Sequence, residues 1–65
     1  MIILDIFQVI PTEKNPNIGF NIVLSDPIRE KQAVVFMPKV DETERAMVRR
    51  IALLLRRLQY EGNGR

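Results

Sequence analysis

Apolar residues recur at every second position in the first two thirds of the chain and at every third or fourth position near its end. The alternation is clearest in IGFNIVLS, residues 18–25, and is typical of a β-strand with one buried face. The residues expected on the buried face are Ile18, Phe20, Ile22 and Leu24. This stretch therefore predicts the strand around which a small sheet is built.

Two further strands are predicted, one on each side of it in the sequence. Residues 1–10 and 32–37 are rich in β-branched and aromatic side chains, and Pro11 and Pro38 end them. Asp26-Pro27 suits a turn between the second and third strands, because the proline ring presets its own φ angle. The order of the strands predicts an antiparallel meander.

The first predicted strand is apolar on both of its faces. One face carries Ile2, Leu4, Ile6 and Ile10, and the other carries Ile3, Phe7 and Val9. A strand with one face in water would alternate more cleanly, so both faces are expected to be covered. Two interpretations stay open: a central strand in the sheet, or a strand whose second face meets another subunit.

The apolar spacing near the end of the chain predicts a helix over about residues 42–60. Asp41 is the expected N-cap, with Glu44 three residues later as in a capping box. Glycines follow the helix, and the tail 61–65 is expected to fray. The apolar stripe consists of Met47, Ile51, Leu54 and Leu58, widened by Val48 and Leu55.

These elements predict one α+β domain over residues 1–65: a three-stranded antiparallel meander with one long C-terminal helix packed on it. One helix cannot cover both faces of a sheet, and 46% of the chain is hydrophobic. Cys and His are absent, so neither a disulfide nor a metal bound by these residues can support a small core. We therefore expect a homodimer or higher homo-oligomer. The interface residues expected on the helix are Ile51, Leu53, Leu54, Leu55, Leu58 and Tyr60.

Positive charge is concentrated on the predicted helix. Residues 45–60 contain five arginines and no acid, whereas residues 1–40 are balanced. Helical spacing places the arginines in two rows, Arg45, Arg49 and Arg56 in one and Arg50 and Arg57 in the other, with Leu53 between them. Asp41 and Glu42 are expected to pair with Arg45, and Glu61 with Arg57. Arg49, Arg50 and Arg56 are left without a local acidic partner.

Three interpretations of the arginines remain open. They can keep the back of an ordinary packing helix soluble. They can bind DNA or RNA phosphates, which arginine contacts with two parallel hydrogen bonds; this is the leading function, with all five arginines as binding residues. They can dock an acidic protein or an anionic membrane surface. In the protein version, an adaptor or inhibitor of the type encoded by viruses or mobile elements, Leu53 is the apolar centre of an arginine-rimmed contact.

Catalysis is not expected. The chain has no His or Cys to act as base or nucleophile, and its acids are explained by loops and the helix start. No glycine-rich phosphate loop occurs, and a chain this short has little room for a pocket, so we expect no cofactor or small-molecule substrate. Without Cys or His, we expect no metal either. The apolar N-terminus is interrupted by Asp5 and is too short for a membrane span. A cytoplasmic location is expected.

The predicted order of elements is similar to that of the small DNA-binding domains of some tyrosine integrases and plant AP2 factors. The resemblance is one of element order, with no shared motif. It implies a sheet face that enters the major groove and carries basic residues. The predicted strands offer Gln8, Asn21, Ser25 and Gln32 instead, with no Arg or Lys. That binding mode is therefore not expected here.

Overall fold

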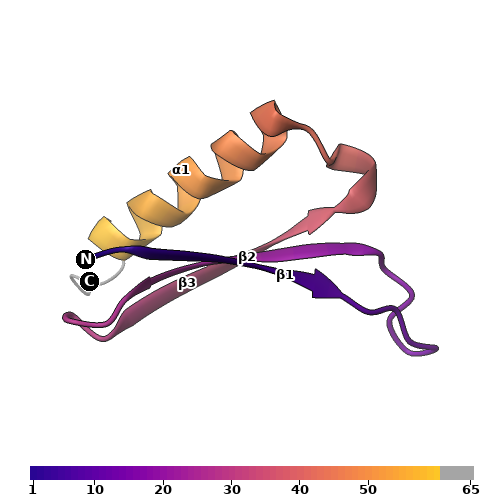
Figure 1. Cartoon of the computed structure of the whole chain (residues 1–65), viewed down its shortest axis with the longest axis horizontal. Helices are drawn as coiled ribbons and strands as arrows, with labels where there is room; N and C mark the ends of the chain where they lie inside the picture. The colour runs from indigo at the N-terminus through magenta and orange to yellow at the C-terminus, as the bar shows by residue number, and fades with distance from the viewer. Residues whose placement is uncertain (61–65) are drawn as a thin grey trace.

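The computed structural model describes residues 1–60 and has an α+β fold, with three antiparallel strands in the order β1-β2-β3 and one helix after them (Figure 1). The elements are β1 (Ile3–Val9), β2 (Gly19–Asp26), β3 (Lys31–Pro38), a short 3₁₀ helix η1 (Lys39–Asp41) and α1 (Glu44–Tyr60). The predicted meander and C-terminal helix are thus confirmed. The predicted fraying of the tail concerns residues 61–65, which lie outside the described residues.

The core lies between the sheet and α1. Register places Ile22 of β2 opposite Ile6 of β1 and Val35 of β3, so these three side chains share the face toward the helix. The buried core consists of Ile22, Leu24, Ala33, Met37, Leu54 and Leu58. Phe20, Val35, Met47 and Ile51 pack against it and are partly buried. The alternation in β2 and the helical stripe therefore meet as their periods predict, except at Ile18, which precedes β2 and is 52% exposed.

β1 is an edge strand, so of the two interpretations of its apolar faces the central strand is wrong, while covering by another subunit stays a prediction. Six of its seven residues are exposed, and the contacts of α1 with the sheet are made mainly with β3 and β2. The physical reason is the short connection through η1, which returns the chain directly over the last strand. The apolar faces of β1 are therefore uncovered in the single chain, on the helix side and on the opposite side.

The β2–β3 turn follows the predicted Asp26-Pro27 start. The Oδ1 atom of buried Asp26 accepts a hydrogen bond from the Arg29 N–H at 3.2 Å, which is turn chemistry of the kind that aspartate favours. The turn ends at Glu30, whose N–H donates to the Pro27 carbonyl at 3.3 Å. Glu30 has a φ of 55°, the one left-handed conformation among the described non-glycine residues.

Thr43, not Asp41, caps the helix. The Thr43 hydroxyl accepts a hydrogen bond from the Ala46 N–H at 3.1 Å, which satisfies one of the first unpaired donors of α1. Asp41 belongs to η1, and α1 starts at Glu44 rather than near residue 42. The predicted capping box is wrong because η1 uses residues 39–41 before the helix can begin.

Candidate nucleic-acid interface

The five arginines of α1 project in two directions, as the two predicted rows require. Arg50 and Arg57 reach toward β3 and are partly buried. The other three, Arg45, Arg49 and Arg56, are exposed. The expected five-residue site is therefore divided between the side of the sheet and the outer surface of the helix.

Arg50 is held by three acceptors from three elements. Its guanidinium donates to the Phe36 carbonyl at 3.4 Å, to the Ala46 carbonyl at 3.4 Å and to Asp41 Oδ2 at 3.2 Å. The last contact is also an ion pair, with half of the Asp41 side chain exposed. The expectation that Arg50 lacks a local acidic partner is wrong, and so is the pairing of Asp41 with Arg45. The turn made by η1 brings Asp41 to Arg50, which spacing along a regular helix could not predict.

Arg57 makes a similar contact two helical turns further along. One of its guanidinium nitrogens donates to the Val34 carbonyl at 3.3 Å. The carbonyls of Val34 and Phe36 both face away from β2. This orientation follows from the hydrogen bond of the Lys39 N–H to the Ile18 carbonyl, since backbone groups alternate in direction along an antiparallel strand. The two arginines therefore cap the outer edge of β3.

The outer surface of α1 carries a row of arginines that have no such role. Helical geometry places Arg49 about 6 Å and Arg56 about 16 Å beyond Arg45 along the axis. Within residues 1–60, these three side chains make no hydrogen bond or ion pair. Their guanidinium groups are in water and available to an external anion. We call Arg45, Arg49 and Arg56 the arginine row.

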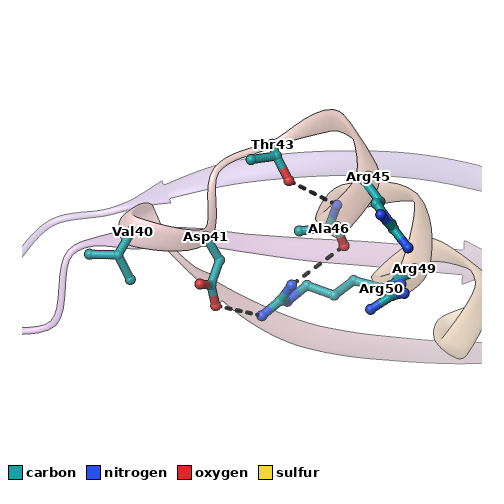
Figure 2. A pocket seen from close by; sticks show the side chains of 7 residues that line it. All are labelled: Val40, Asp41, Thr43, Arg45, Ala46, Arg49 and Arg50. Atoms are coloured by element: carbon teal, nitrogen blue, oxygen red, sulfur yellow. Dashed lines mark hydrogen bonds and ion pairs between the residues drawn. The ribbon is translucent and has the colours of Figure 1, made fainter.

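A shallow hollow adjoins the start of the row (Figure 2). Figure 2 shows Arg50 extended across it to Asp41, while Arg45 and Arg49 project from the helix at its border. The hollow is lined by Val40, Asp41, Thr43, Arg45, Ala46, Arg49 and Arg50. Three arginines against one aspartate make this surface cationic, so it attracts anions.

The apolar residues expected at an interface separate into two groups. Leu54 and Leu58 are buried in the core and Ile51 is partly buried, so these three stabilise the fold. Leu53 and Leu55 are each 40% exposed. Tyr60 is 68% exposed and lies near Leu53 by helical spacing. Leu53 thus remains an apolar side chain between the arginine row and the arginines that cap β3.

The described part of the chain offers little other chemistry. Residues 1–60 contain no group of three or more acidic side chains placed to hold a metal ion. Within the same residues, no helix is long and apolar enough to cross a membrane. Comparison with protein-family models, curated proteins and solved structures finds no match.

Proposed function

We propose that this chain is a non-catalytic binding protein whose partner is a nucleic acid, with the arginine row contacting the phosphates. The observation that carries the proposal is the row itself: three exposed guanidinium groups without partners in residues 1–60. Arginine is the side chain best suited to phosphate, because its planar group can donate two parallel hydrogen bonds.

The charge distribution supports the same partner. α1 contains five arginines and one glutamate, a net charge of +4, whereas the whole chain carries +2. The remaining residues are therefore net negative by two charges, and the positive potential is concentrated on the helix. A polyanion with regularly spaced phosphates can contact all three members of the row, whereas a single anion can contact one or two. Binding of this kind depends on backbone charge and weakens as salt rises.

The test compares two pairs of substitutions that lower the net charge equally. Arg49→Gln with Arg56→Gln removes two members of the row, and Lys14→Gln with Lys39→Gln removes two exposed lysines elsewhere. We expect the arginine pair to lower the salt exponent of binding to duplex DNA or single-stranded RNA by about two. The lysine pair should leave the exponent close to that of the wild type.

Fluorescence anisotropy over a range of salt concentrations measures both exponents. An equal decrease of the salt exponent in the two double variants would show that net charge, and not the row, determines binding. No binding of either nucleic acid at low salt would reject the proposed function. Thermal melting of both variants checks that the fold survives.

The exposure of Leu53 favours a second function, docking of an acidic protein around an apolar centre. Leu53→Ser keeps the charge of the surface and removes the apolar side chain. This second function predicts that the substitution abolishes binding of a protein partner and leaves nucleic-acid affinity and thermal melting unchanged. If the chain binds only nucleic acid, Leu53→Ser should leave all of its binding unchanged.

A further inference from the structure

The two edges of the sheet are protected to very different extents. The outer edge of β3 is capped by Arg50 and Arg57, and the strand itself begins with Lys31 and ends with Pro38. Charged side chains and proline at an edge are common means of preventing pairing with another chain. β1 contains no Lys, Arg or Pro between Ile3 and Val9, and α1 does not cover it.

The unpaired backbone groups of β1 can be assigned from the register. Even-numbered residues of β2 bond to β3, as the Lys39–Ile18 bond shows, so odd-numbered residues of β2 bond to β1. Their partners in β1 are residues 3, 5, 7 and 9. The N–H and C=O groups of Leu4, Ile6 and Gln8 therefore point outward, away from the sheet.

The side chains along this edge are apolar on both faces. Toward the helix side, Leu4 is 45% and Ile6 is 44% exposed; on the opposite face, Phe7 is 55% exposed. The border of α1 away from Arg50 and Arg57 carries Val48 and Leu55, which are exposed as well. Unpaired backbone and uncovered apolar side chains thus coincide at one edge.

We propose that β1 pairs antiparallel with β1 of a second copy of this chain, joining two sheets into one of six strands. A second copy fits because the edge is self-complementary when Ile6 lies opposite its own symmetry mate. Leu4 then lies opposite Gln8 of the other copy, and all seven residues of β1 are paired. About six hydrogen bonds form, since Leu4, Ile6 and Gln8 each exchange two with their partners.

Asp5 disfavours one alternative register, and the pairing of all seven residues favours this register over the others. A shift that places Leu4 opposite Ile6 of the other copy also places Asp5 directly opposite Asp5, and like charges opposite each other destabilise a sheet. With Ile6 opposite Ile6, each Asp5 lies opposite Phe7 instead. The charge is then diagonal to its mate and remains on the exposed face of the sheet.

The symmetry of this pairing also places the helices. A two-fold axis perpendicular to the sheet keeps both α1 helices on the same face, one on each side of the joined β1 strands. Val48 and Leu55 of each copy then lie beside the space between the two helices, above Leu4 and Ile6. This arrangement reduces the apolar surface that is exposed to water. The interface does not include the arginine row, so it is independent of the proposed function.

The test uses the position that meets itself across the axis. Ile6→Lys and Ile6→Glu each place like charges opposite one another, so each variant should be monomeric by light scattering while the wild type has twice the chain mass of 7.6 kDa. An equimolar mixture of the two variants should restore the dimer, because each pair then joins opposite charges. Recovery in the mixture also demonstrates that both variants fold.

Val34→Lys is the matched control. Val34 is 45% exposed, close to the 44% of Ile6, but it lies on β3 and on the sheet face opposite the helix. This variant should remain a dimer. A monomeric wild type would overturn the proposal, as would a mixture that stays monomeric. Dissociation by Val34→Lys but not by Ile6→Lys would also overturn it, in favour of face-to-face stacking of the sheets.

Discussion

At the scale of single residues, Glu30 occupies a backbone conformation that suits a different amino acid. Its φ of 55° brings Cβ close to a backbone carbonyl, at a cost of about 1–2 kcal/mol for an L-residue. Glycine adopts the same conformation without that contact. The Glu30–Pro27 and Arg29–Asp26 hydrogen bonds close the turn and keep Glu30 in this strained conformation.

We expect Glu30→Gly to raise the free energy of unfolding by about 0.5–1 kcal/mol, the strain relieved less the greater freedom of glycine in the unfolded chain. Urea denaturation measures the change. Glu13→Gly is the matched control, since it alters the charge equally at an exposed loop residue without a positive φ. A gain no larger than that of the control would show that Glu30 is not strained.

Gly19 is fixed by space rather than by backbone conformation. A Cβ on this residue would collide with the carbonyl oxygen of Met37 and the ring of Phe36. The Phe36 ring thus fills the position that a side chain would take on β2. The alternating pattern of β2 placed Gly19 on the face away from the helix but contained no information about the ring that covers it.

At the scale of elements, α1 is amphipathic in the usual sense, yet its leucines have different roles. Leu54 is fully buried against β2 and β3, while its neighbour Leu53 is 40% exposed. The helical period predicts this difference, because adjacent residues lie about 100° apart. The packing of α1 on the sheet therefore depends on the stripe that contains Leu54 and Leu58.

We expect Leu54→Ala to lower the free energy of unfolding by about 2–5 kcal/mol, the usual cost of a large cavity. A core of this size supplies about 3–5 kcal/mol, so the variant should be largely unfolded by circular dichroism at room temperature. Leu53→Ala is the adjacent control and should change stability by about 0.5 kcal/mol or less. Similar losses in both variants would contradict the assignment of Leu53 to the surface.

At the scale of the whole molecule, the two proposals combine into one surface. Pairing through β1 places two arginine rows on the same face of a six-stranded sheet. A single row makes three phosphate contacts, which corresponds to a salt exponent of about −2.7 on duplex DNA. Two rows engaged together double the exponent, so the assembly and the binding surface can be tested in one experiment.

We expect the salt exponent of the wild type to be about twice that of Ile6→Lys, whose added charge lies on the helix side of β1, away from the row. This prediction rests on both proposals, and anisotropy with a duplex long enough to reach both rows measures it. The mixture of Ile6→Lys and Ile6→Glu serves as control and should recover the wild-type exponent. Equal exponents in the wild type and Ile6→Lys would show that the two rows do not act together.

Much of the architecture was predictable because it depends on local period. The predicted strands agree with the observed β1, β2 and β3 to within two residues at each end. The predicted helical stripe contains both buried leucines of α1. The N-cap residue of α1 and the exposure of β1 beside the helix were not predictable. Both depend on the path of η1 between β3 and α1, for which the sequence carries no periodic signal.

By itself, the sequence determined the elements and most of the inward-facing residues, because apolar side chains must recur at the period of the structure that buries them. It also determined that the arginines form two rows, since helical geometry alone separates them. Only the tertiary structure decided what each row contacts. The return of α1 over β3 brings Arg50 and Arg57 to backbone carbonyls 14 and 23 residues away. The same return leaves the arginine row in water and β1 uncovered, because one helix is too narrow to cover three strands.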